Sequence, residues 1–227
     1  MVEPPLHQGW ERLWRRGVVY SDQPQQEVVD LATRLEAEGR RRVLDLGCGM
    51  GRHLLWLASE GFQVSGCDVS PTAVAACRDA LKASALRAGI IRAEMTAVPF
   101  KTGVFDAVIA WDVVFHSTVS GILATIQGVH RSLSDYGLFL VTFNSVESSD
   151  RLKARHAAAT GQGEELEPET YVVPSDPLDK ALPHHYVTER EIRTRLLAGF
   201  HILSMQKYGH EFAEHRNVKW WVLAERR

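Results

Sequence analysis

Hydrophobic and polar positions alternate along the first 145 residues in a way that predicts helices and short buried strands in turn. Apolar residues at helical spacing predict helices, and short continuous apolar runs predict buried strands. We expect helices over residues 25–38, 51–60, 70–81 and 122–133, and strands at 43–46, 62–67, 89–93, 105–111 and 136–145. Such alternation indicates βαβ units, and hence a parallel sheet with helices on both faces.

This rhythm changes after residue 145. Residues 146–187 are polar and contain four prolines, Pro168, Pro174, Pro177 and Pro183. A connection of this length usually serves as a functional lid or a mobile segment. Thr188 and Glu191 have capping-box spacing at the start of a last helix, and two final strands are expected near 200–208 and 218–224.

Charge and cysteine content exclude several classes of protein. The 227 residues carry 26 Lys and Arg against 28 Asp and Glu, for a net charge of −2, which disfavours a dedicated nucleic-acid binder. We expect no membrane span and no signal peptide, because no segment has the roughly 18 apolar residues that cross a bilayer. Three cysteines without a CxxC pair predict neither a disulfide framework nor a zinc site. A cytoplasmic location follows as the expectation.

The most informative segment is VLDLGCGMGRH at residues 43–53, where a strand enters a glycine-rich turn and leaves it as a helix. Such a turn lets a ligand approach the backbone and the free N–H groups of the helix closely. The spacing is G-x-G-x-G, and Arg52 occupies the place of the last small residue in the dinucleotide fingerprint. Asp45 would not help to bind a pyrophosphate, but it suits an amino group. The segment therefore disfavours NAD.

A second acid follows at the end of the next predicted strand. Asp68 lies 21 residues after Gly47, where a carboxylate accepts hydrogen bonds from ribose hydroxyls. Asp68 could instead cap the following helix, but Ser70 already suits that role. A ligand with a ribose, a cationic amino-acid end and no phosphate satisfies both Asp45 and Asp68. S-adenosylmethionine is such a ligand.

The motif D-L-G-C-G-x-G after a strand, with an acid ending the second strand, resembles the class I S-adenosylmethionine-dependent methyltransferases. Residues 93–100, AEMTAVPF, are similar to the family's segment after strand three, FDAVI at 105–109 to its fourth strand, and 133–139 to the turn into its fifth. The resemblance covers about residues 40–145. It implies a Rossmann-like, mostly parallel sheet of seven strands with helices on both faces, the last strand being antiparallel.

The two ends of the chain suggest a closer likeness. The segment with Trp10, Trp14 and Tyr20, and the ending KWWVLA at 219–224, are similar to small-molecule members of the methyltransferase 11/25 and tellurite-resistance groups. The aromatic residues near the N-terminus have two interpretations, as core packing or as a flap that closes over the cofactor and excludes water.

The resemblance also implies which residues contact the cofactor. An acid after strand three and its neighbour reach the adenine in this family, and here Glu94 stands where many members have Asp. Trp111, at the end of the fourth strand, could pack on the adenine or the methionine. The cofactor-binding residues predicted in this way are Asp45, Gly47, Cys48, Gly49, Asp68, Val69, Glu94, Met95 and Trp111.

Methyl transfer requires an aligned nucleophile near 3 Å from the methyl group, and for many acceptors a base. His116 is the candidate base, because it follows the fourth strand and ligands bind beyond the carboxyl ends of parallel strands. A structural histidine bonded to backbone is the other interpretation. His184 and His185 are further candidates, of which at most one faces the pocket in an extended segment. We predict no metal site, because no acid or cysteine lies at ligand spacing from this pair.

These features predict a single-domain methyltransferase that uses S-adenosylmethionine and acts on a small molecule. The expected parts of the domain, 1–227, are an N-terminal flap and helix (1–39), a cofactor-binding core (40–145), a loop that covers the substrate (146–187), and a C-terminal helix with strands (188–227). An NAD-dependent oxidoreductase, a non-catalytic S-adenosylmethionine-binding module, and an RNA or protein acceptor are the alternatives. The acceptor atom and the oligomeric state do not follow from the sequence.

Overall fold

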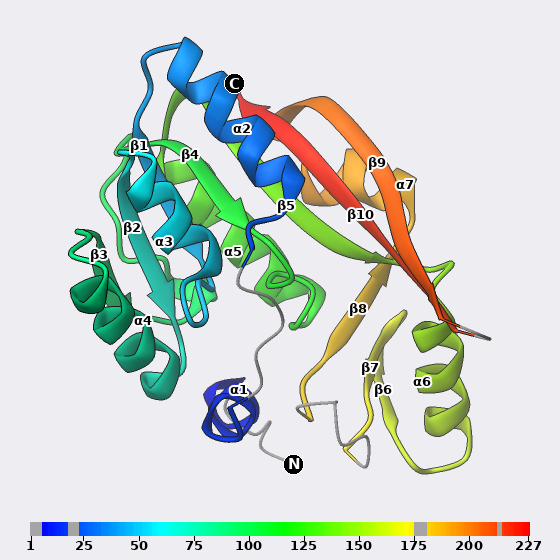
Figure 1. Cartoon of the computed structure of the whole chain (residues 1–227). Coiled ribbons are helices and arrows are strands. Elements are labelled where there is room, and N and C mark those ends of the chain that lie inside the picture. Colours follow the sequence, from blue (N-terminus) through cyan, green and yellow to red (C-terminus); the bar gives the residue numbers. More distant parts are fainter. Residues whose placement is uncertain (1–5, 18–22, 175–180, 213–214) are drawn as a thin grey trace.

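The computed structural model describes residues 6–17, 23–174, 181–212 and 215–227 (Figure 1). The helices are α1 (Leu6–Arg15), α2 (Gln26–Ala37), α3 (Arg52–Ser59), α4 (Pro71–Ala83), α5 (Val119–Ser132), α6 (Ser149–Ala159) and α7 (Glu189–Glu191), with short turns η1 (Met95–Ala97) and η2 (Ile192–Leu196). The strands are β1 (Arg42–Leu46), β2 (Gln63–Asp68), β3 (Gly89–Arg92), β4 (Phe105–Ala110), β5 (Leu133–Ser145), β6 (Glu164–Glu167), β7 (Thr170–Val172), β8 (His184–Val187), β9 (Phe200–Phe212) and β10 (His215–Arg226).

Seven of these strands form the main sheet, in the order β3-β2-β1-β4-β5-β10-β9. The pairs from β3 through β5 are all parallel, whereas β10 is antiparallel to both β5 and β9. This arrangement confirms the predicted mostly parallel sheet with an antiparallel last strand. It also brings the carboxyl ends of β1, β2 and β4 to one edge, where a ligand is expected.

Helices cover both faces of the sheet because neighbouring strand residues point in opposite directions. On one face Val43 and Ile109 pack with the buried residues of α2, α3 and α4. On the other, Leu44 and Val108 pack with α5 and with Ile192 of η2. Figure 1 shows α2 and α3 in front of the strands and α5 behind β4. The central strands are therefore buried on both sides.

The prediction of a long loop at 146–187 was wrong for the part of this segment that the structure describes. It folds into α6 and the short strands β6, β7 and β8, and β8 runs parallel to the end of β5, with Asn144 opposite Tyr186. These strands extend the sheet beyond the predicted seven. Strands of three or four residues show no clear alternation of apolar and polar positions, and α6 buries only Ala154 and Ala157. The hydrophobic pattern of this segment therefore did not predict these elements. Pro177 lies outside the described residues.

The structure confirms two of the predicted helix starts by their capping hydrogen bonds. The side chain of Ser70 accepts a hydrogen bond from the N–H of Ala73, at 3.1 Å, and Thr188 accepts one from the N–H of Glu191, at 3.2 Å. The helix after Thr188 is shorter than expected, because α7 passes after one turn into η2, a π-type turn. Within the described residues no helix is both long and apolar enough to cross a membrane.

Candidate active site

The glycine loop joins β1 to α3 and is fixed against the end of β2. The N–H groups of Gly47 and Cys48 both donate to the carbonyl oxygen of Cys67, at 2.8 and 3.0 Å. Gly47 has a φ of +69°, and a Cβ built on it would lie 2.5 Å from Cγ2 of Val113. Only glycine therefore allows the loop to pass this close to the segment after β4.

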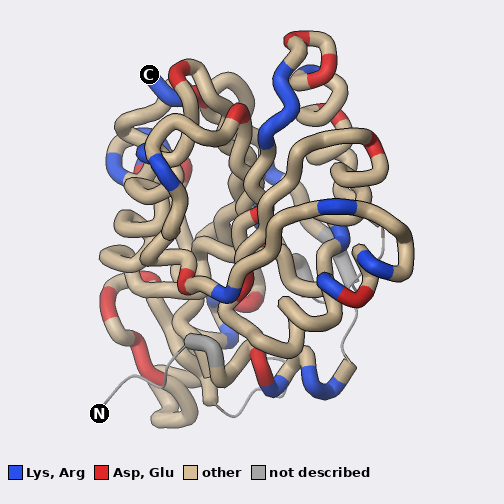
Figure 2. The backbone as a smooth tube through the Cα atoms, turned by 90° about the vertical axis from the view of Figure 1, so that its left-hand side faces the viewer, with Lys and Arg blue, Asp and Glu red and all other residues tan. Residues whose placement is uncertain are grey.

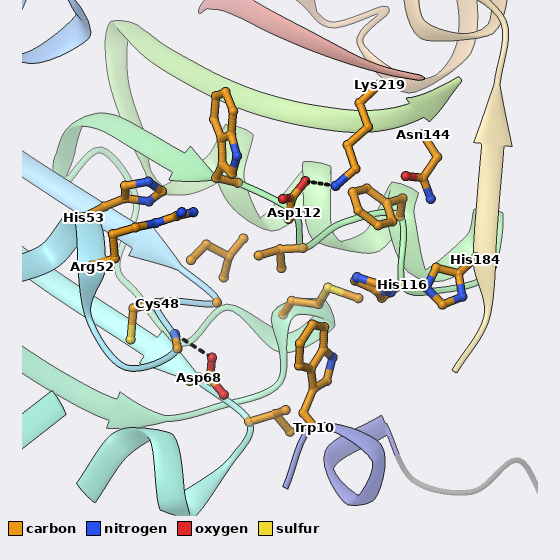
Figure 3. A pocket seen from close by; sticks show the side chains of 18 of the residues that line it. Trp10, Cys48, Arg52, His53, Asp68, Asp112, His116, Asn144, His184 and Lys219 are labelled. Atoms are coloured by element: carbon orange, nitrogen blue, oxygen red, sulfur yellow. Dashed lines mark hydrogen bonds and ion pairs between the residues drawn. The ribbon is translucent and has the colours of Figure 1, made fainter. Parts of the chain in front are cut away.

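Asp68 connects the glycine loop to the start of α4. Its Oδ2 accepts a hydrogen bond from the N–H of Gly49 and its Oδ1 one from the N–H of Ser70, both at 2.9 Å (Figure 3). Burial raises the pKa of Asp68, and the backbone hydrogen bonds oppose that rise. Because each carboxylate oxygen has more than one acceptor site, Asp68 can hold the loop and still accept hydrogen bonds from a ligand.

A cavity of about 1250 Å³ opens beside this loop. Pockets for one small ligand measure roughly 300–1,000 Å³, so this cavity has room for a second molecule. Eight of the nine predicted cofactor residues line it, and so does the predicted base His116. The eight are Gly47, Cys48, Gly49, Asp68, Val69, Glu94, Met95 and Trp111.

Asp45 is the predicted cofactor residue that does not line the cavity. It is 2% exposed and lies in β1, behind the glycine loop. Burial raises the pKa of Asp45 to about 7, although the charge of Arg52 opposes the rise. The structure thus places the Asp45 carboxylate in a buried strand outside the cavity lining, and its contact with an amino group stays a prediction.

Histidine and aromatic rings gather in the half of the cavity away from Asp68. The ring of His116 meets that of His184 nearly edge-on, with centroids 4.5 Å apart, and lies 4.4 Å from the ring of Phe115. His116 follows β4 and His184 begins β8, and both point toward the cavity in Figure 3. His116 thus lines the cavity, and its role as a base stays a prediction.

His185 points away from the cavity and has a structural role. Its Nδ1 lies 2.7 Å from Oγ1 of Thr170, and its Nε2 lies 3.4 Å from Oε1 of Glu191. This buried histidine ties β7 and β8 to α7. Of the adjacent pair, only His184 lines the cavity, which agrees with the prediction that at most one of them faces it.

Lys219 is a site residue that the sequence reasoning missed. Its Nζ lies 2.6 Å from Oδ1 of Asp112 and 5.2 Å from the centre of the Phe115 ring. Asp112 lies two residues after the end of β4 with a φ of +58°, and its N–H donates to Oγ1 of Thr142 at 2.7 Å. Residues 112 and 219 are 107 positions apart, and the register of β10 on β5 brings them together. No local motif could have found this pair.

Helix α1 packs over the site, and its Glu11 ties it to the start of α4. Both carboxylate oxygens of Glu11 accept hydrogen bonds at 2.6 Å, from the hydroxyls of Ser70 and Thr72. Burial acts to raise the pKa of Glu11, but these hydrogen bonds outweigh it and hold the pKa at about 2. Trp10 meets the His116 ring edge-on with centroids 4.9 Å apart. Trp10 and Trp14 therefore occupy the place expected of an aromatic flap, while Tyr20 lies outside the described residues.

Comparison with known proteins identifies the core. Residues 43–137 match a family model described as a methyltransferase domain. The match covers less than half of the chain, and it agrees with the methyltransferase family that the glycine loop and Asp68 predict.

The chain is also similar to individual proteins over part of its length. The chain is 38% identical over 77 residues to the 18S rRNA (guanine-N(7))-methyltransferase of Schizosaccharomyces pombe, which is 34% of this chain and 28% of that protein. It is 33% identical over 99 residues to an uncharacterized methyltransferase of Synechocystis, or 44% and 45% of the two chains. The chain thus spans less than half the length of either relative.

A solved structure extends the likeness in fold to the whole chain. The magnesium protoporphyrin IX methyltransferase of Synechocystis, with bound S-adenosylhomocysteine, superposes with a TM-score of 0.68 at 22% identity. The match covers 100% of this chain and 98% of that one. Among the described residues, no group of three His, Cys, Asp or Glu side chains forms a metal site, and all three cysteines are free.

Proposed function

We propose that this protein transfers the methyl group of S-adenosylmethionine to a small molecule bound in the second half of the cavity. The main support for the proposal is that one cavity is lined by two separate groups of residues. Glycine-loop and Asp68 groups line one part, and α6, β7 and β8 contribute the opposite wall. Its volume exceeds that of an ordinary one-ligand pocket, as a site for cofactor and acceptor together requires.

The cofactor would lie along the glycine loop. Asp68 and Glu94 both line the cavity on the side of β2 and β3, where they can bind the ribose and adenine of the adenosine. Met95 and Val69 add apolar contacts for the ring. A structural neighbour of the same fold was crystallised with S-adenosylhomocysteine, which supports this placement.

The chain's contribution to the reaction is mainly alignment. The sulfonium charge disappears as the methyl group moves, so the acceleration comes chiefly from holding the acceptor atom near the methyl group and in line with it. His116, at the cavity wall between Trp10 and His184, would take the proton from an oxygen, nitrogen or sulfur acceptor. Closure of α1 would exclude water from the same space.

A small acceptor fits the surface better than a nucleic acid, although one relative is named for rRNA. Figure 2 shows Lys and Arg positions interspersed with Asp and Glu on the side drawn, apart from one short run of neighbouring Lys or Arg positions. The net charge is −2, whereas a nucleic-acid surface carries clustered cations. A cytoplasmic location is part of the proposal and is supported by three free cysteines.

The test combines binding and turnover. Titration calorimetry of the full chain should show micromolar binding of S-adenosylhomocysteine and no binding of NAD. Assays of methyl transfer should then find turnover with a small-molecule acceptor. His116→Gln should lower kcat at least about tenfold for a protic acceptor, while Lys82→Ala, at an exposed position of α4 outside the cavity lining, should not. Binding of NAD would favour the oxidoreductase. Binding of the cofactor without turnover on any acceptor would favour a non-catalytic binding module. Turnover on RNA alone would refute the small-molecule class of acceptor.

A further inference from the structure

A row of polar side chains crosses three strands in the half of the cavity away from Asp68. Asn144 of β5 lies opposite Lys219 of β10 on one side and opposite Tyr186 of β8 on the other, and all three line the cavity. In an antiparallel pair, residues directly opposite one another have Cβ atoms roughly 4.5–5.5 Å apart on one face of the sheet. Figure 3 shows Lys219 and Asn144 extending into the cavity. The pairing of β5 with β10 thus places an amide beside an ammonium group.

Asn144 is a buried amide whose polar atoms are available to a ligand. The residue is 5% exposed, and within the described part of the chain its side chain makes no hydrogen bond. An asparagine amide can donate two hydrogen bonds and accept others. A buried polar group without a partner is costly, and a ligand in this half of the cavity would supply the missing partner.

Lys219 adds a cation that keeps donors for a ligand. Its Nζ donates to Oδ1 of Asp112 at 2.6 Å and lies 5.2 Å from the centre of the Phe115 ring. An ammonium group has three donors, so the pair with Asp112 leaves two of them for other acceptors. The Lys219 side chain is 18% exposed, and hydrogen bonds to a charged donor are about twice as strong as neutral ones.

Aromatic rings surround the space beside this row. Tyr171 of β7 lies opposite His184 of β8, and its ring centroid is 6.2 Å from that of Tyr186. The rings of Phe115 and His184 are 6.4 Å apart and inclined by 32°. All four residues line the cavity. Since aromatic rings pack favourably against one another in stacked or edge-on arrangements, this wall suits a flat aromatic ligand.

We infer that the methyl acceptor is an aromatic carboxylate, with its ring among these aromatic side chains and its carboxylate bound by Lys219 and Asn144. This inference rests on the proposed function, because it concerns the molecule that receives the methyl group. The two donors belong to different side chains, and a carboxylate has two oxygens, so one oxygen accepts from Nζ of Lys219 and the other from the amide of Asn144. A neutral carbonyl group has only one oxygen for the two donors.

Three matched ligands test the carboxylate. The first, 6-hydroxy-2-naphthoate, carries the acid, 6-hydroxy-2-naphthamide replaces it with a neutral amide, and 2-naphthol lacks the group. Each is titrated by calorimetry into the full chain saturated with S-adenosylhomocysteine. The acid should bind at least about tenfold more tightly than either of the other two ligands, because only the acid makes a charge-assisted hydrogen bond with its own charge.

Two variants test the residues that bind the acid. Lys219→Met and Asn144→Leu keep similar side-chain volumes and each remove one partner of the carboxylate. Each should weaken binding of the acid at least about fivefold and leave the affinity for 2-naphthol within about twofold. Lys82→Ala, which removes an exposed cation of α4 outside the cavity lining, should change neither affinity. Cooperative thermal unfolding shows that a variant is folded, and the comparison of the three ligands on the parent chain needs no variant.

Several outcomes would overturn the inference. One is failure of the acid to bind the saturated chain, and another is equal binding of the acid and its amide by the parent. A third is an equal loss for the acid and 2-naphthol in both variants. Lys153 lines the cavity from α6, and a selective loss of the acid in Lys153→Ala but not in Lys219→Met would also refute this site. Failure of the parent chain to bind S-adenosylhomocysteine would instead refute the proposed function itself.

Discussion

Two aspartates that look equivalent in the sequence have different positions relative to the cavity. Asp68 ends β2 at the cavity, where its carboxylate holds Gly49 and can still reach a ligand. Asp45 lies opposite Gly66, two residues before Asp68 in the register of β1 on β2, and its side chain is buried in the strand outside the cavity lining. The sequence could predict both acids from spacing. Which face of the loop each carboxylate takes depends on the twist and pairing of the strands, and spacing does not encode that.

Replacing Asp68 tests its contact with the ribose. Asp68→Ala should weaken binding of S-adenosylhomocysteine by roughly 1.5–3 kcal/mol for each charge-assisted hydrogen bond lost, as measured by calorimetry. Asp79→Ala, at an exposed position of α4 whose ion pair with Lys82 is also exposed, should have no effect. Unchanged affinity in Asp68→Ala would exclude this carboxylate from the cofactor site.

Asp45 makes the stability of the unliganded protein depend on pH. Its pKa is about 7 in the fold against an ordinary value near 3.8, so between these values the folded state binds a proton that the unfolded state lacks. Stability therefore falls as pH rises from about 4 to 7, by at most about 4 kcal/mol. Asp45→Asn should remove this dependence. Denaturant unfolding should then show that the free energy of unfolding of Asp45→Asn, relative to the parent, is more favourable at pH 8 than at pH 5. Equal pH dependence in both proteins would contradict a buried, protonated Asp45.

At the level of elements, long periodic segments were predictable and short ones were not. The helices and strands from α2 to β5 follow from apolar spacing, and Ser70 and Thr188 mark helix starts by their own hydrogen bonds. The segment 146–187 was misread because its strands bury few residues each. The position of α1 was beyond prediction for another reason. Its Glu11 pairs with hydroxyls about 60 positions away, and a contact at that separation leaves no local pattern.

Removing the Glu11 anchor should release α1. Glu11→Ala loses the hydrogen bonds from Ser70 and Thr72, so the helix should become more susceptible to proteases and S-adenosylhomocysteine should bind several-fold more weakly. Arg15→Ala removes only an exposed ion pair with Glu11 and should cost little. Because the pKa of Glu11 is lowered from 4.5 to about 2, the anchor is fully present above pH 4.5 and weakens as pH falls toward 2. Loss of α1 protection between pH 5 and 8 in the parent protein would contradict this anchor.

At the scale of the whole molecule, one cavity lies at the edge of the sheet where β1, β2 and β4 end. Its walls beside the glycine loop come from segments before residue 117, and much of the opposite wall comes from 146–187 and β10. The sheet order and most of the residues that line the glycine-loop half of the cavity could therefore be predicted from one continuous stretch of sequence. The acceptor half could not, because α6, β8 and β10 meet there only after the sheet has formed.

Cofactor binding should raise the thermal stability of the whole chain. Ligand at 100 times its Kd adds about 2.7 kcal/mol to the folded state, which corresponds to a rise in Tm of roughly 5–10 °C for a chain of this size. Differential scanning fluorimetry with S-adenosylhomocysteine should show this rise, and NAD at the same concentration should not. A flat response to S-adenosylhomocysteine at saturating concentration would mean that the ligand does not favour the folded state.

The segment 146–187 begins and ends at the same place. The N–H of Val146 donates to the carbonyl oxygen of Val187 at 3.1 Å, and β8 then pairs with the last residues of β5. An insertion whose two ends are joined at its base can be replaced, lengthened or shortened during evolution without moving the strands beneath it. Descendants of one ancestral chain could thus diversify their acceptors by exchanging this segment, while the glycine loop and its cofactor are inherited unchanged.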